Sequence, residues 1–146
     1  MTAPSEIAQA DELRRHGESA RRRRDLAAAQ NYYAEAVALL RNSTDRMKFA
    51  HTVRHLGDVY VELQNWPSAE PCFVEALKVY RSQPSSHLLD FANAIRAYAV
   101  LKEKSGRPDE SRELWAEAGP MYQALGIADG VEECNLHAGP TNESIS

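Results

Sequence analysis

Three arginines recur along the chain at nearly constant spacing. Arg14, Arg54 and Arg96 are separated by steps of 40 and 42 residues. Arginine presents a planar fork of N–H donors that matches a carboxylate, so a row of arginines on one surface suits an extended acidic peptide. The alternative is that each arginine pairs with an acidic neighbour, and exposed pairs contribute only about 0–1 kcal/mol each. The spacing therefore indicates either a ligand-binding row or a coat of surface ion pairs.

Other residues with reactive chemistry lack the partners that they need. His51 and His55 are spaced i, i+4 and share one side of a helix, with Asp58 as the nearest third metal ligand. No Glu follows His51 as a zinc-protease motif requires, and His55 is also well placed for packing against a neighbouring helix. Cys72 and Cys134 are too few for a disulfide framework. We predict no metal site and no cofactor.

Catalytic motifs are also missing. The sequence contains no Gly-rich phosphate loop, no Gly-x-Ser-x-Gly elbow and no Cys-x-x-Cys pair. Cys72 next to Phe73 is expected to be a small buried hydrophobe, and Cys134 has no identifiable base. We predict that the protein is not an enzyme.

The charge balance disfavours nucleic acid and membranes as partners. The chain of 146 residues has a net charge of −4, and its basic run Arg21–Arg24 has neither interleaved aromatics nor a second basic cluster. Basic residues at a helix C-terminus are also favourable to the helix dipole, which explains the run without a ligand. No apolar stretch approaches the roughly 20 residues of a membrane span, and no signal peptide is recognisable, so a cytoplasmic location is predicted.

The elements that must position these residues are helices. Apolar residues recur at spacings of three and four, as in Ala29, Tyr33, Ala36 and Leu40. Asp25 and Asn65 are predicted N-caps, and Pro84 is predicted to stop a helix. The pattern predicts seven helices, over 5–23, 26–41, 45–63, 67–81, 86–105, 109–124 and 128–137.

Internal repetition supports a more specific fold. Small residues recur at Gly17, Gly57 and Ala99, in steps of 40 and 42 residues, and the series Ala36, Ala76 and Ala118 repeats these steps. A small residue in one helix lets its partner helix approach closely. The middle unit carries Leu56-Gly57, Tyr60, Ala69, Phe73 and Ala76, and this set resembles the tetratricopeptide repeat.

The resemblance implies an all-α fold, a right-handed superhelix of three helix–turn–helix hairpins closed by a short C-terminal capping helix. The implied domain covers residues 1–138, with repeats at 8–42, 45–83 and 86–125, a capping helix at 128–137 and a flexible tail at 139–146. The long period is similar to that of kinesin light chains and bacterial regulatory repeat proteins.

In this family the first helix of each hairpin lines a concave groove that usually holds the ligand. The resemblance therefore implies a non-enzymatic scaffold that binds a protein or peptide segment. Glu18 and Asp58 stand where a chaperone-tail clamp would need Asn, so we predict against that clamp. The alternatives are a structural module that forms a homodimer through its last helix (Val131, Cys134, Leu136) and a small-ligand or peptide sensor. The candidate groove residues are Arg14, Glu18, Arg21, His51, Arg54, Asp58, Asn93 and Arg96.

Overall fold

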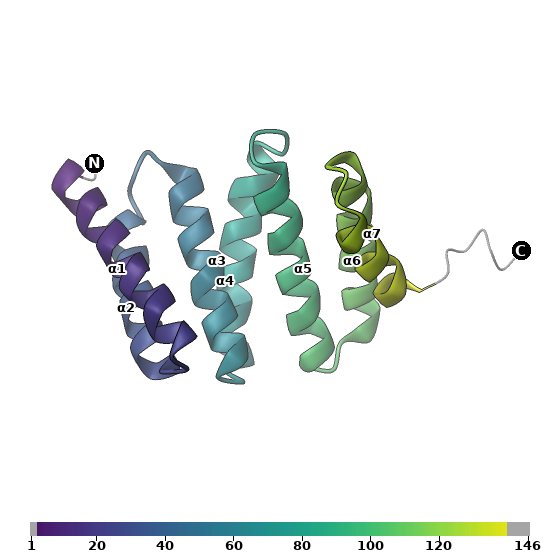
Figure 1. The fold of residues 1–146 in the computed structure, drawn as a ribbon, viewed down its shortest axis with the longest axis horizontal. Helices are drawn as coiled ribbons and strands as arrows, with labels where there is room; N and C mark the ends of the chain where they lie inside the picture. The colour runs from purple at the N-terminus through teal and green to yellow at the C-terminus, as the bar shows by residue number, and fades with distance from the viewer. Residues whose placement is uncertain (1–2, 140–146) are drawn as a thin grey trace, which may run out of the picture. The chain divides into compact units, whose positions relative to one another are not determined.

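The computed structural model describes residues 3–139, and within them the chain is entirely helical, with seven helices (Figure 1). Each predicted helix boundary lies within two residues of the observed one, so the predicted all-helical class is confirmed. The predicted tail lies outside the described residues except for Gly139. The helices are α1 (Pro4–Arg22), α2 (Leu26–Leu40), α3 (Arg46–Glu62), α4 (Trp66–Ser82), α5 (Leu88–Lys104), α6 (Pro108–Ala124) and α7 (Ala128–Ala138).

The helices fall into two compact units. Unit 1 is Met1–Tyr80 and holds α1, α2, α3 and all but the end of α4. Unit 2 is Arg81–Ser146 and holds α5, α6 and α7. In unit 1, α2 packs against both α1 and α3, and in unit 2, α6 packs against both α5 and α7.

Side-chain caps fix where several helices begin. The carboxylate of Asp25 accepts a hydrogen bond from the backbone N–H of Ala28 at 3.2 Å, and the amide oxygen of Asn65 accepts one from Ser68 at 3.3 Å. Each cap satisfies one of the N–H groups that a helix start leaves without an intrahelical partner. Both predicted caps are confirmed. Asp45, the first residue of the predicted helix 45–63, caps α3 in the same way, accepting a hydrogen bond from the backbone N–H of Lys48 at 3.0 Å.

Four turns share one backbone geometry. Each has a residue in the left-handed region two positions after the last helical residue: Arg24 (φ 64°), Gln64 (φ 61°), Gly106 (φ 79°) and Gly126 (φ 72°). In each, the next residue's N–H reaches back to the last turn of the helix, as from Asp25 to Ala20 at 2.9 Å and from Arg107 to Lys102 at 2.8 Å. This is the Schellman arrangement, which satisfies the helix's terminal carbonyls with main-chain donors.

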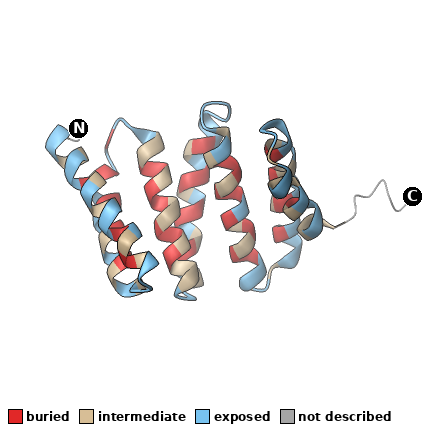
Figure 2. Ribbon diagram, viewed as in Figure 1, coloured by how far each residue is buried: buried red, intermediate tan, exposed pale blue. Residues whose placement is uncertain are grey.

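In unit 1 the repeated glycines are the points of closest helix approach. A Cβ placed on Gly17 would lie 3.0 Å from the ring of Tyr33, and one on Gly57 would lie 3.0 Å from the Phe73 ring and from Cβ of Cys72. Tyr33 and Phe73 are buried. Buried and exposed residues alternate in short stretches along the helices (Figure 2). The sequence expectation that a small residue lets the partner helix approach closely is confirmed here.

Unit 2 repeats this packing with different residues. Trp115 is completely buried, and the hydroxyl of Ser111 donates to the carbonyl of Ala99 at 2.9 Å, joining α6 to α5. Lys102 is buried where a core side chain would be expected; its ammonium lies 4.8 Å from the centre of the Tyr98 ring and 3.5 Å from the Glu110 carboxylate. The buried charge is therefore compensated within the unit.

Candidate functional site

Unit 1 contains a cleft of about 620 Å³, which lies within the size range of small-ligand and peptide sites. Side chains from α1, α2 and α3 line it, so the hairpin and the first helix of the next repeat build it together. The lining residues are Asp11, Arg14, Arg15, Glu18, Arg21, Tyr33, Lys48, His51 and His55.

Four of the candidate groove residues line this cleft: Arg14, Glu18, Arg21 and His51. Arg54 and Asp58 lie beside it, because both contact His55. The sequence hypothesis omitted other lining residues, among them Arg15 and Lys48. Arg15 follows Arg14 in α1. The repeat pattern that singled out Arg14 gives no indication that Arg15 also lines the cleft.

The cleft has the opposite charge sign to the chain. Its lining holds four cations and two carboxylates, a net charge of +2 with the histidines neutral, whereas the whole chain carries −4. Asp11 is shared by two of these cations, with an oxygen 3.3 Å from the Arg14 guanidinium and 3.1 Å from the Lys48 ammonium. The resulting potential favours an anionic ligand.

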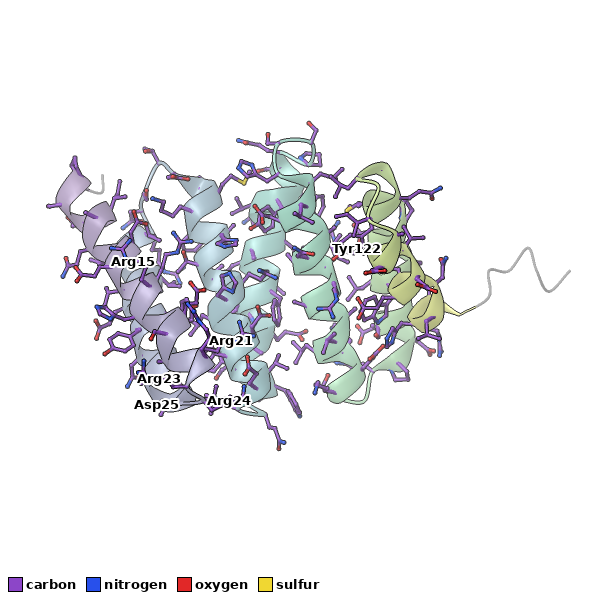
Figure 3. The ribbon with its side chains drawn as sticks, viewed as in Figure 1. Arg15, Arg21, Arg23, Arg24, Asp25 and Tyr122 are labelled. Carbon is purple, nitrogen blue, oxygen red and sulfur yellow. The ribbon has the colours of Figure 1, made fainter. Side chains whose placement is uncertain are left out.

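Arg15 differs from the other arginines of the cleft in its lack of an ion-pair partner within residues 3–139. Arg14 and Arg21 hold ion pairs with Asp11 and Glu62, while Arg15 is exposed and makes no hydrogen bond or ion pair within residues 3–139. Figure 3 labels it on α1. An incoming anion can therefore bind Arg15 without displacing an internal partner.

Two of the cleft-lining residues, His51 and His55, contact each other through their imidazole rings. The Nε2 atoms of His51 and His55 lie 3.1 Å apart, and the guanidinium of Arg54 is 3.5 Å from Nε2 of His55. A guanidinium only donates, so Nε2 of His55 accepts from both neighbours. His51 then donates through Nε2–H, and the proton of His55 is on Nδ1, which is 3.7 Å from the Asp58 carboxylate. The pair is electrically neutral in this arrangement.

The surroundings favour the neutral form of His55. Burial first, and then electrostatic effects of Arg54, His51, Arg21 and Arg14, lower the pKa of His55 from 6.5 to about 2. Tyr33 stacks on His55 with ring centres 5.9 Å apart, and burial raises the pKa of this tyrosine. Both aromatic groups therefore present uncharged surfaces beside the arginines.

The basic run at the end of α1 is largely used inside unit 1. Arg21 and Arg24 both pair with Glu62 of α3, Arg22 pairs with Glu18 at 3.0 Å, and Arg23 donates to the hydroxyl of Ser19 at 2.7 Å. Figure 3 shows Arg23 and Arg24 together at the helix end. The Arg21 and Arg24 contacts tie α1 and the turn that follows it to α3.

The remaining two candidate residues belong to unit 2. The carboxamide oxygen of Asn93 accepts a hydrogen bond from the Tyr122 hydroxyl at 2.6 Å. Arg96 binds the Glu133 carboxylate through two N–H groups at 2.6 and 2.9 Å, and this contact joins α5 to α7. In unit 2 these side chains thus connect helices of the repeat.

A second hollow, of about 610 Å³, lies along α7 and the turn before it. Ile127, Ala128 and Val131 form its apolar part, and Glu132 and Asn135 belong to its lining. On the same helix the side chain of Leu136 is 79% exposed, the largest exposure among the exposed large hydrophobic residues of the described chain.

Within residues 3–139, no group of three or more His, Cys, Asp and Glu side chains is arranged to hold a metal ion. No helix of the same part of the chain is long and apolar enough to cross a membrane.

Comparison with known proteins gives the family. Residues 6–82 match the tetratricopeptide repeat model. The solved N-terminal domain of stress-induced protein-1 from C. elegans is similar over 91% of this chain and 99% of that chain, with a TM-score of 0.67 at 15% identity. BtubC (BKLC) from P. vanneervenii is similar over 84% of this chain, with a TM-score of 0.65 at 17% identity, and this match spans 58% of that protein. No match was found among the curated proteins.

At these identities the two structures establish the fold, and the model match establishes the family. Tetratricopeptide repeat domains are generally scaffolds for protein–protein interaction and are typically non-enzymatic. With paired helices, small residues at the helix contacts and a matching model over more than half of its length, the chain belongs to the tetratricopeptide repeat family.

Proposed function

We propose that this protein is a non-enzymatic scaffold that holds an acidic segment of a partner protein in the unit 1 cleft. The observation that carries the proposal is the local reversal of charge, a cleft of net charge +2 in a chain of net charge −4. Arg15 is the first contact for the incoming anion because it has no internal partner to exchange. Arg14 and Lys48 follow by exchanging part of their contact with Asp11.

The chemistry of the wall supports a peptide as the ligand. Alongside the cations, the cleft offers the ring of Tyr33 and two neutral imidazoles, which suit the apolar atoms of a short chain segment. Guanidinium groups bind carboxylate and phosphate through paired N–H donors. A segment with neighbouring acidic side chains would meet both properties of the wall.

Fluorescence anisotropy with a labelled hexaglutamate peptide, acetylated and amidated at its ends, tests the proposal. We expect Arg15→Glu to weaken binding at low salt by about tenfold, since it replaces an attraction by a repulsion. Arg23→Glu is the matched control, because it makes the same charge change at the end of the same helix and Arg23 is not part of the cleft lining.

Equal losses in the two variants would show that the peptide senses only the net charge of α1. Binding that is unchanged in Arg15→Glu, or absent in the unmodified protein, would rule out the cleft as the acidic-peptide site. Circular dichroism of each variant checks that the helices are retained.

A second candidate function, self-association, is supported by the exposure of Leu136 beside the α7 hollow. Here a second copy of the chain would cover the apolar side chains of α7. Sedimentation at several concentrations tests it: a dimer that dissociates in Leu136→Glu supports this function, and a monomer at every concentration excludes it.

A further inference from the structure

Two joints, at which one helical hairpin leads into the next, are closed by the same three kinds of side chain. Arg41, directly after α2, lies over the ring of Phe49 in α3, with its guanidinium carbon 5.4 Å from the ring centre, and binds the carboxylate of Glu75 in α4 at 2.8 Å. In unit 2 the same set recurs as Arg81, Phe91 and Glu117. There the guanidinium carbon lies 5.5 Å from the ring centre, and two N–H groups bind the carboxylate. An arginine at the end of one hairpin thus contacts both helices of the next.

The joint between α6 and α7 keeps the spacing of the other two but not their side chains. The helices α3, α5 and α7 begin at residues 46, 88 and 128, so Val131 is the fourth residue of its helix, as Phe49 and Phe91 are of theirs. Gln123 takes the place of Arg81, at the penultimate position of a helix of equal length. Both Gln123 and Val131 line the hollow along α7, and no helix follows α7 within residues 3–139. The hollow therefore lies where the earlier joints meet the second helix of a hairpin.

The lining of this hollow follows one face of α7. Ala128, Val131, Glu132 and Asn135 have the spacing i, i+3, i+4 and i+7, which places them on a single stripe of the helix. Leu136, with its 79% exposed side chain, is one turn beyond Glu132 and lengthens the apolar part of this stripe. An elongated face of this kind suits another helix laid along it.

The charge of the surface indicates which kind of helix would bind. Residues 108–138 contain seven carboxylate side chains and one arginine, a net charge of −6 with the histidine neutral, against −4 for the whole chain. Glu117 and Glu133 are already paired with arginines. Asp129 and Glu132 are exposed, lie three residues apart on α7 and make no hydrogen bond or ion pair through their side chains within residues 3–139. A cationic partner can bind these two carboxylates without displacing an internal cation.

We propose that the hollow along α7 binds an amphipathic helix with a basic polar face, supplied by a partner protein. The apolar side chains of that helix contact Ile127, Ala128 and Val131, and its lysines or arginines pair with Asp129 and Glu132. This site lies in unit 2 and does not depend on the unit 1 cleft. The scaffold would then hold two partners of opposite charge, an acidic segment in unit 1 and a basic helix in unit 2.

The probe is a fluorescein-labelled peptide of two Leu-Lys-Lys-Leu-Leu-Lys-Leu heptads, acetylated and amidated, whose leucines share one face of a helix. Fluorescence anisotropy measures its affinity for the whole chain. We expect Glu132→Lys to weaken binding by about fivefold, because it replaces an exposed attraction by a repulsion. Glu113→Lys is the matched control, since Glu113 is exposed on α6 of the same unit and is not part of the hollow lining.

The apolar contribution is tested separately by a change that leaves the charge alone. Val131→Asn should weaken binding by about tenfold, because a valine buried by the ligand is replaced by a polar side chain. Val74→Asn, at an exposed valine of unit 1, is its control and should bind like the unmodified protein. Circular dichroism checks that each variant keeps its helices, and Glu132→Lys decides alone should Val131→Asn lose them.

Losses in Glu132→Lys and Val131→Asn with both controls unchanged support the proposal. Equal losses in Glu132→Lys and Glu113→Lys, undiminished binding in a folded Val131→Asn, or no binding to the unmodified protein overturns it. A peptide with glutamate in place of lysine that binds equally well also overturns it, since charge would then not select the ligand. If sedimentation of the protein alone shows a dimer that dissociates in Leu136→Glu, the surface belongs to a second copy and the proposal falls.

Discussion

The imidazoles of His51 and His55 meet edge to face, with ring centres 4.5 Å apart and Nε2 atoms 3.1 Å apart. Two histidines one helical turn apart are usually considered as metal ligands. Here the guanidinium of Arg54 lies 3.5 Å from the shared nitrogen of His55, and a cation in that position opposes a metal ion. The pair is better described as a hydrogen-bonded unit within a cationic wall.

The free protein is expected to lose stability in mild acid because of this pair. The folded-state pKa of His55 is about 2, below its ordinary value of 6.5, so below pH 6.5 the unfolded chain binds a proton that the folded chain does not. The free energy of unfolding should fall by on the order of 1 to 2 kcal/mol between pH 7 and pH 5. Urea unfolding at several pH values measures it, and His55→Gln should flatten the dependence. A profile identical in the variant would assign the acid sensitivity to other groups.

Two glycines at the α6–α7 contact should respond oppositely to alanine. A Cβ on Gly130 would lie 2.6 Å from the ring of buried Tyr122, so Gly130→Ala forces a shift and should destabilise by about 1–3 kcal/mol. A Cβ on Gly119 would meet Cβ of Cys134 at an ordinary 3.4 Å, so Gly119→Ala should be neutral or stabilising, by up to about 1 kcal/mol. Thermal unfolding compares the two, and equal effects would contradict the packing described for α7.

A single oxygen of Glu103 is expected to hold α7 in place. It accepts hydrogen bonds from Nε1 of Trp115 and Nδ1 of His137, both at 2.8 Å, and the two rings stack 4.4 Å apart. Glu103→Ala leaves the indole N–H of a fully buried tryptophan without its acceptor, which should cost about 1–3 kcal/mol. Hydrogen exchange should then accelerate first in α7.

Glu103→Gln is the control for that experiment, because it keeps an acceptor oxygen and removes only the charge. The Glu103→Gln variant should retain most of the protection of the α7 amides against hydrogen exchange. If both variants exchange like the unmodified protein, the stacked rings alone hold the helix.

Both cysteines are expected to be inert in the folded state. Cys72 and Cys134 are buried, and burial raises the pKa of both thiols, that of Cys72 to about 12. Since the thiolate is the reactive form, iodoacetamide should modify them only as fast as the protein opens. Mass spectrometry of the time course checks this, with denatured protein as the reference. Rapid labelling under native conditions would show that α4 or α7 opens locally.

The helices and their caps could be predicted from sequence because they depend on local signals. Asp25 and Asn65 are cap residues in a standard context, and the spacing of Gly17 and Gly57 predicted where helices touch. The candidate site was predicted only in part. Repeat position identified Arg14 and Arg21 but not the free cation Arg15, since the availability of a guanidinium depends on which carboxylates other helices bring to it.

The roles of Asn93 and Arg96 illustrate the same limit. Their repeat positions are those of candidate groove residues, yet Tyr122 and Glu133 engage them in unit 2. These partners lie 29 and 37 residues away along the chain. Local periodicity contains no information on pairing at that distance.

The four Schellman turns do not depend on the side chain of the residue in their left-handed position. Arginine, glutamine and glycine occupy the same left-handed position, at 24, 64, 106 and 126, because main-chain bonds close each turn. The residue in the left-handed position can therefore vary without redesign of the helices on either side. Glycine at 24 or 64 would relieve backbone strain, whereas arginine at 24 supplies a link to Glu62 in return. The turns at 24, 64 and 106 each join the two helices of one hairpin, so a hairpin can keep its main-chain closure while the residue at its turn changes.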